Sequence, residues 1–333
     1  MDNRYRRYLP QLYRERDSAF IPAQSWPKTL IDLALARGQQ EHKLLRNTGI
    51  FYEDIAQGNI LLTPQQIFRL LDNATRQPQG YELVFLVARD LLTPYQAHLS
   101  QANNLAELLD YFVTYAGTLS PLLSLHLHYE QDRLVIYWQD NFGADELTPF
   151  LLAMMASSMR NFTRWRSASS PTWTFYFKHA KPEYIEQYQV HLGEQLVFNA
   201  RADAIAIARH ELHSNWPKIP TSMNIINPLT AENPRGFLHE VYYYLHSNLQ
   251  DQPNLEQCAQ DFGMSSATLK RKLQKHHSSF QQQYDLVRKH LALHWLSETR
   301  ITQEEVARQL HFYDAANLRR AFKRWTGQGP GKL

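Results

Sequence analysis

Apolar residues recur every three or four positions in the first part of this 333-residue chain, which is the spacing of one helix face. Proline suits the first turn of a helix, so Pro27 and Pro64 mark two helix starts. Thr63 and Gln66 have the spacing of a capping box, in which each side chain binds the other residue's backbone N–H. The predicted helices cover 27–38, 64–71, 83–92 and 105–116, after an irregular lead-in over 1–25.

Alternation of apolar and polar residues, the period of a strand, dominates from residue 123 onward. It predicts a hairpin with strands at 123–129 and 134–138, a strand at 172–177 and a short strand within 190–198. A helix is expected over 149–165, whereas 203–212 is ambiguous. Helices followed by strands indicate an α+β N-terminal domain.

The last quarter of the chain contains one pattern twice. Asn254 can cap a helix whose Leu255, Cys258, Ala259 and Phe262 share a face, and Ser265 can cap a second helix after a Gly263-Met264 turn. The second copy has Thr302 and Glu305 at capping-box spacing, a turn around His311-Phe312, and Asp314 as the next cap. A helix, a tight turn and a second helix with a basic outer face are the pattern of a helix-turn-helix motif.

The two copies superpose residue by residue. Ala259 aligns with Ala307, Leu269 with Leu318, and Arg271 with Arg320, with one extra residue in the second turn. Between them, apolar residues from Phe280 to Trp295 recur every three to four positions and predict one long helix. Two second helices on such a spacer could enter successive major grooves about 34 Å apart.

These features, with the closing run Phe322-Lys323-Arg324-Trp325-Thr326-Gly327-Gln328-Gly329-Pro330, resemble the DNA-binding domain of AraC/XylS-type transcription regulators. The family usually has glycine where His311 stands, and usually continues further after the proline. The N-terminal half resembles, more loosely, the ligand-sensing domain of ornithine-utilisation-type regulators. That resemblance is carried by Leu92-Thr93-Pro94, by Phe177-Lys178-His179-Ala180-Lys181-Pro182 and by Leu196-Val197-Phe198. The family's cupin-like sugar-binding barrel is a poorer match, because so much of this half is expected to be helical.

Charge is unevenly distributed. Residues 251–333 contain 13 Lys and Arg against 8 Asp and Glu, whereas the remainder contains 22 against 24. A basic C-terminal part fits contact with phosphates, although a solvated helix face has the same composition. Cys258 is the only cysteine, which excludes a disulfide within the chain and fits a reducing, cytoplasmic location. The basic start lacks the apolar run of a signal peptide, and no stretch is long enough to cross a membrane, so no membrane partner is expected.

The predicted organisation is an α+β N-terminal domain over 1–216 for effector sensing or dimerisation, a proline-containing linker over 217–234, and an all-α tandem helix-turn-helix domain over 235–333. Inward-facing leucines and phenylalanine leave one outer face on each second helix. The expected DNA-binding residues are Ser266, Ala267, Lys270, Arg271, Lys272, Ala315, Ala316, Asn317, Arg319, Arg320 and Lys323. Among the basic ones, Lys272 and Lys323, together with Lys275 and Arg324, are better placed for phosphates than for bases.

Other chemistry has weaker support. His126 and His128 share a strand face, but no cysteine or carboxylate at ligand spacing joins them, so a sheet role is favoured over a metal. The aromatic residues of the strands line either an effector pocket or the core: Tyr129, Tyr137, Trp138, Trp173, Phe175 and Tyr176. No phosphate-binding glycine loop, nucleophile elbow or HExxH motif is present, and no cofactor is expected.

The resemblance implies a sequence-specific transcription regulator, usually an activator, that binds double-stranded DNA as a homodimer, contacts RNA polymerase and responds to a small-molecule effector. The effector-binding residues are not identifiable from the sequence. One alternative is a constitutive DNA-binding protein whose N-terminal half only dimerises or binds a protein. A second is an enzyme with an autoregulatory C-terminal half, which would need a cleft around His126, His128 or His179.

Overall fold

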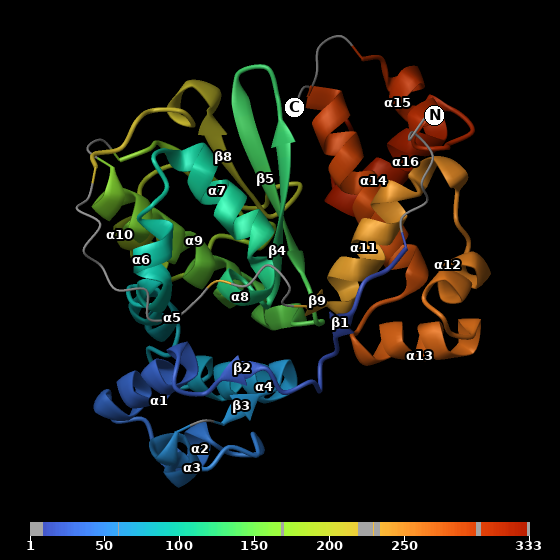
Figure 1. Ribbon diagram of the computed structural model, residues 1–333. Coiled ribbons are helices and arrows are strands. Elements are labelled where there is room, and N and C mark those ends of the chain that lie inside the picture. Colours follow the sequence, from blue (N-terminus) through green and yellow to red (C-terminus); the bar gives the residue numbers. More distant parts are fainter. Residues whose placement is uncertain are drawn as a thin grey trace.

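The computed structural model describes residues 9–58, 60–167, 170–218, 229, 234–297 and 301–331. Most of the expected linker, namely 219–228 and 230–233, lies outside the described residues. Figure 1 shows a mixed helix and sheet region in blue to yellow beside a helical region in orange to red. The expected class, an α/β N-terminal region followed by a helical C-terminal region, is therefore confirmed at this level.

Helices precede the main sheet, as the apolar periodicity predicts. They are α1 (Trp26–Ala36), α2 (Glu41–Leu44), α3 (Tyr52–Gln57), α4 (Pro64–Thr75), α5 (Glu82–Val87), α6 (Gln96–Leu99), α7 (Leu105–Thr114) and α8 (Ala116–Leu119). The capping box at α4 is confirmed: the Thr63 hydroxyl accepts from the Gln66 backbone N–H at 3.2 Å, and the Gln66 side-chain oxygen accepts from the Thr63 N–H at 3.0 Å. Short 3-10 turns lie at Thr93–Tyr95, Asp145–Leu147, Arg209–Glu211 and Leu249–Asp251.

The lead-in is not wholly irregular. It contains β1 (Tyr13–Arg14), which pairs in parallel with β9 (Arg235–Gly236), and β2 (Ile21–Pro22), which pairs antiparallel with β3 (Leu61–Leu62). The prediction failed here because the partner strands are distant in sequence, and two-residue strands have no periodicity of their own. As a result, the lead-in touches both regions of the molecule (Figure 1).

The described residues form a five-stranded main sheet in the order β4-β5-β8-β6-β7. Its strands are β4 (Leu123–Tyr129), β5 (Arg133–Asp140), β6 (Trp173–Tyr176), β7 (Leu196–Val197) and β8 (Ala204–Ala208). The β4–β5 hairpin is confirmed, with Tyr129 opposite Leu134 at its tip. The ambiguous 203–212 stretch contains β8, which is antiparallel to both β5 and β6. Of the stretch 190–198, the first residues complete α10 (Ile185–Leu192) and only β7 is extended.

Both faces of this sheet are covered. On one face, Ile136, Trp138 and Ile205 pack into the N-terminal core together with residues of α5, α7 and α9 (Thr148–Arg166). On the other face, Val135, Tyr137 and Ala204 belong to the core of the C-terminal helices. Because both faces are covered, β5 is buried continuously from Leu134 to Gln139, rather than at every second residue as in a half-solvated sheet.

The C-terminal region consists of α11 (Phe237–Ser247), α12 (Leu255–Asp261), α13 (Ser266–Lys275), α14 (Phe280–Ser297), α15 (Gln303–Gln309) and α16 (Ala315–Thr326). The turns after α12 and α15 have the same hydrogen bonds: Met264 N–H to Ala259 O at 2.9 Å, and Phe312 N–H to Ala307 O at 2.8 Å. The turn residues also match, since Gly263 has φ 68° and His311 has φ 59°. Histidine thus adopts the left-handed conformation for which glycine is better suited.

Candidate nucleic-acid interface and N-terminal pocket

The helix α13 presents a basic face and buries the opposite one. Ser265 caps it by accepting a hydrogen bond from the Thr268 N–H at 3.2 Å. Leu269 and Leu273 are buried, as the spacing predicts. Ala267, Lys270 and Arg271 are exposed, while Ser266 and Lys272 are half-buried. The outer face of α13 therefore has exposed side chains from its first turn onward, as a helix that enters a DNA groove requires.

The helix α16 is organised in the same way. Asp314 caps it, with its carboxylate 2.6 Å from the Asn317 backbone nitrogen. The Asn317 side chain donates to Asp314 at 2.9 Å and accepts from the Arg320 guanidinium at 2.7 Å. These bonds hold Arg320 over the first turn of the helix. Arg319, Arg320 and Lys323 are all exposed.

Two expectations for this region need correction. Ala315 was placed on the outer face, yet it is only 8% exposed, because the first residue of α16 turns back toward the core. Ala316 is half-buried. The capping box at α15 is half formed: Thr302 accepts from the Glu305 N–H at 3.1 Å, but the Glu305 carboxylate binds Arg308 and Gln309 instead of returning to the cap.

The C-terminal end of α13 contacts the lead-in. Glu15 forms ion pairs with Lys272 and, at 3.3 Å, with Lys275, and Asp17 pairs with Lys275 at 2.6 Å. Burial raises the pKa of the Glu15 carboxyl, but Lys272 and Lys275 outweigh this and hold it below its usual value, and Lys275 lowers the pKa of Asp17. Sequence reasoning missed both acids, because nothing local to residues 15–17 indicates a partner far along the chain. Two candidate phosphate-binding lysines are thus neutralised within the molecule.

A buried histidine fixes this contact. The Arg16 backbone N–H donates to His276 Nε2 at 3.0 Å, and the His276 Nδ1–H donates to Lys272 O at 2.8 Å, which defines the neutral ring. Burial lowers the pKa of His276 to about 4. The Arg16 guanidinium in turn donates to Gly143 O at 2.6 Å, beside the main sheet. The lead-in therefore bridges α13 and the N-terminal region.

The same lead-in forms one wall of a pocket in the N-terminal region. The pocket has a volume of about 480 Å³ and includes Phe20, Ile21 and Pro22 from the lead-in and Leu151 and Met154 from α9. Its walls are largely apolar, which is typical of small-molecule sites. The strand aromatics do not line it; Trp138, Trp173 and Phe175 are core residues.

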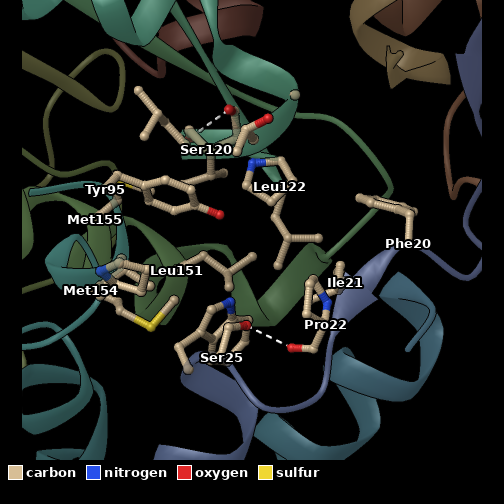
Figure 2. Close-up of a pocket in the computed structure, with 18 of the residues that line it drawn as sticks. Phe20, Ile21, Pro22, Ser25, Tyr95, Ser120, Leu122, Leu151, Met154 and Met155 are labelled. Carbon is tan, nitrogen blue, oxygen red and sulfur yellow. Dashed lines mark hydrogen bonds between the residues drawn. The ribbon is translucent and has the colours of Figure 1, made fainter. Parts of the chain in front are cut away.

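Tyr95 is the most suggestive polar group in this pocket. Figure 2 shows its ring among the lining side chains, with the hydroxyl directed into the space between them. In the part of the chain that the structure describes, that hydroxyl has no hydrogen-bond partner, whereas the hydroxyls of Ser25 and Ser120 bind Pro22 O at 2.6 Å and Leu123 O at 2.7 Å. Burial raises the pKa of Tyr95, so the phenol stays protonated and can donate to a ligand.

His126 and His128 face the C-terminal helices. The His126 ring stacks on Tyr242 at 4.0 Å between centroids, and the Tyr242 hydroxyl lies 3.0 Å from His290 Nδ1. Burial lowers the pKa of His126 to about 4 and that of His128 to about 3. Within the described ranges, no group of three or more histidine, cysteine or acidic side chains could hold a metal ion. Nor does any described helix have the length and apolar character needed to cross a membrane.

Comparison with known proteins agrees with this arrangement. Residues 258–333 match a model described as a helix-turn-helix domain. Residues 38–215, over half of the chain, match the arabinose-binding domain of AraC transcription regulator, N-terminal. The chain belongs to the AraC family of transcription regulators. It is thus a DNA-binding regulator whose N-terminal region corresponds to the family's ligand-sensing domain, as the resemblance predicted.

The individual proteins similar to this AraC-family regulator either match only part of the chain or share little of its sequence. It is 40% identical over 101 residues to an ornithine utilization regulator from Pseudomonas aeruginosa, a match that spans 30% of each chain. Among solved structures, the transcriptional regulator CdpR from Pseudomonas aeruginosa is similar with a TM-score of 0.40 and 18% identity, over 92% of this chain and 96% of that one. A DNA-binding transcriptional dual regulator from Escherichia coli K-12 has a TM-score of 0.27 and 22% identity, over 28% and 89%.

Proposed function

We propose that this AraC-family protein activates transcription by binding a specific double-stranded DNA sequence through two helix-turn-helix units. The units are α12–α13 and α15–α16, and α14 is the linker helix that joins them. The observation that carries the proposal is their shared geometry: each pair turns through a left-handed residue, and each second helix exposes arginine near its start. Arg271 and Arg320 hold equivalent positions and would contact guanine in successive half-sites.

The full set of proposed DNA contacts comprises Ser266, Ala267, Lys270, Arg271, Lys272, Ala316, Asn317, Arg319, Arg320 and Lys323. Ala315 is omitted because it is buried. Lys272 reaches a phosphate only after leaving Glu15. Arg320 and Asn317 already bind one another, which would orient both side chains before DNA arrives.

We assign residues 1–216 to an effector-sensing and dimerisation domain, 217–234 to a linker and 235–333 to the DNA-binding domain. The pocket bounded by the lead-in and α9 is the proposed effector site, with Tyr95 as its hydrogen-bond donor. Support comes from the unpartnered Tyr95 hydroxyl and from the lead-in, which contacts both the pocket and α13. The protein would act as a homodimer that contacts RNA polymerase, and no catalytic role is proposed for it.

A constitutive regulator, whose N-terminal half only dimerises, is the competing proposal. It predicts that small molecules leave DNA binding unchanged. The volume of the pocket, about 480 Å³, favours the effector-responsive alternative, because a half that serves only for dimerisation has no need of such a space.

A genome-fragment binding selection, with and without a metabolite extract and at a stated salt concentration, tests the proposal. We expect a motif with two half-sites about one helical turn apart. Arg271→Ala and Arg320→Ala should each relax one half-site, whereas Lys43→Ala, a change on α2 away from both units, should alter neither. The DNA-binding proposal is wrong if the recovered fragments share no motif and neither arginine variant changes the selection. An unchanged motif with extract would instead favour the constitutive alternative.

A further inference from the structure

The outer face of the main sheet has a hollow beneath α14. Strand β8 alternates alanine and isoleucine, so Ile205 and Ile207 point into the N-terminal core while Ala204 and Ala206 point toward the C-terminal helices. An alanine methyl fills little of the space between sheet and helix. Larger side chains stand on both sides, with Tyr137 on β5 and Tyr176 on β6, each in register with Ala204.

This hollow is part of an interdomain pocket with a volume of about 430 Å³. The sheet contributes Tyr137, Tyr176 and Ala204, and the chain after β7 contributes Phe198. Helix α14 closes the other side with Leu293 and Ser297. Both regions of the protein are therefore needed to form the pocket, which shares no lining residue with the N-terminal pocket.

Tyr137 places a hydroxyl donor in this pocket. Its side chain is only 6% exposed, and its ring stacks on His290 at 4.9 Å. Among the described residues its hydroxyl has no hydrogen-bond partner, and burial raises its pKa, which keeps the proton in place. Because Tyr137 lines the pocket, a ligand oxygen bound there can accept a hydrogen bond from its hydroxyl.

Charges at the edge of the pocket favour an anion. Arg133 and Arg201 both line it, against one carboxylate, Glu130, which is held by Arg133 at 2.6 Å. Among the described residues, Arg201 donates to the Gly329 carbonyl at 3.2 Å and has no acidic partner. Lys289 lies one turn before Leu293 on the same side of α14, but burial lowers its pKa to about 7, so it carries only part of a positive charge at neutral pH.

We propose that the interdomain pocket binds a small carboxylate with an apolar body. The ligand carboxylate would accept a hydrogen bond from the Tyr137 hydroxyl and lie near Arg133 and Arg201. The apolar part of the ligand would fill the hollow over Ala204 and contact Leu293. This is a second ligand site, beyond the effector site in the N-terminal domain. Because its walls come from both regions, an occupant stabilises their present arrangement and opposes any rotation of the DNA-binding helices away from the sheet.

Calorimetric titration of the full chain with hydrocinnamate, an aryl carboxylate of suitable size, tests this proposal. Hydrocinnamyl alcohol is the neutral probe of the same shape. We expect saturable binding of the acid, at one site per chain, and at least about tenfold weaker binding of the alcohol, because a hydrogen bond to a charged group exceeds one to a neutral group. Tyr137→Phe should weaken binding of the acid by about tenfold or more.

Tyr95→Phe, which removes the equivalent hydroxyl from the N-terminal pocket, is the matched control and should leave acid binding unchanged. Arg201→Gln provides a second variant in case Tyr137→Phe alters folding, which the urea midpoint reports; it should weaken binding of the acid but not of the alcohol. Absence of saturable acid binding overturns the proposal. So does an affinity that falls with Tyr95→Phe and not with Tyr137→Phe or Arg201→Gln. Neither result bears on DNA recognition, which is measured separately.

Discussion

Neutralising Glu15 and Asp17 should make the protein bind DNA more tightly. Lys272 and Lys275 must leave these carboxylates before they can reach phosphates. Partly exposed ion pairs contribute about 0.2–1 kcal/mol each, so removing these three with Glu15→Gln and Asp17→Asn should release about 0.6–3 kcal/mol, which is an affinity gain of about 3- to 150-fold. Most of that gain should come from Glu15, since its side chain is 20% exposed and that of Asp17 is 58% exposed.

Salt dependence gives a second measure of the same change. Each additional phosphate contact steepens the slope of log K against log salt by about 0.9, so two freed lysines should steepen it by up to about 1.8. Fluorescence anisotropy with a selected operator fragment, repeated over a range of salt concentrations, measures both affinity and slope. The affinity gain should be larger at low salt.

A control with the same change in net charge separates this mechanism from general attraction to DNA. Glu41→Gln with Glu53→Gln alters two exposed acids on α2 and α3. If the control gained as much affinity and slope as Glu15→Gln with Asp17→Asn, the local ion pairs would have no part in DNA binding. The reasoning from the α13 contact would then be refuted.

Three further predictions concern recognition and stability. Arg320→Ala should lose about 1–3 kcal/mol of discrimination at one base position, whereas Lys323→Ala should weaken all sequences alike; affinities for a series of single-base operator variants would distinguish them, and a uniform loss for both would contradict the assignment. The pKa of His276 is about 4 in the fold against an ordinary 6.5, so its contribution to stability is complete above pH 6.5 and lost as the pH falls toward 4. By about pH 5.5 that loss is about 1.4 kcal/mol, because the unfolded chain binds a proton at His276 that the folded, neutral ring does not; urea unfolding should show it, and His276→Gln should reduce the dependence by that amount. Phe322→Ala should cost about 3–5 kcal/mol in the same assay, because Phe322 is fully buried, and a loss below about 1 kcal/mol would mean that the core collapses around the cavity.

Local chemistry made the helix starts predictable. The caps at Thr63, Asn254, Ser265 and Asp314 each bind a backbone N–H three residues ahead, so the information lies within four residues of sequence. The buried faces of α13 and α16 followed from spacing for the same reason. Thr302 also accepts its predicted hydrogen bond from the Glu305 backbone N–H, although the Glu305 carboxylate binds Arg308 instead of the Thr302 N–H.

Long-range pairing could not be predicted in this way. The sequence left β8 ambiguous because alanine has no strong preference for strands or for the protein surface. The alanine Ala204 faces the pocket beside α14, which lies far away in the sequence. The same is true of Glu15, whose partner Lys272 follows 257 residues later. Ala315 was misplaced because a residue at the start of a helix can turn inward or outward, and packing decides between them.

The shared core between the sheet and the C-terminal helices constrains how this regulator can move. Val135, Tyr137 and Ala204 pack in one cluster with Leu245 and Val287, so separating the two regions would expose apolar surface to water on both sides. Wholesale detachment is therefore costly, and sliding of α14 across the small alanine side chains of β8 would disturb far fewer contacts. An effector-dependent change in the arrangement of the two regions would then be a shear of a few ångströms between packed layers. A C-terminal fragment separated from the sheet would expose an apolar face, which favours aggregation.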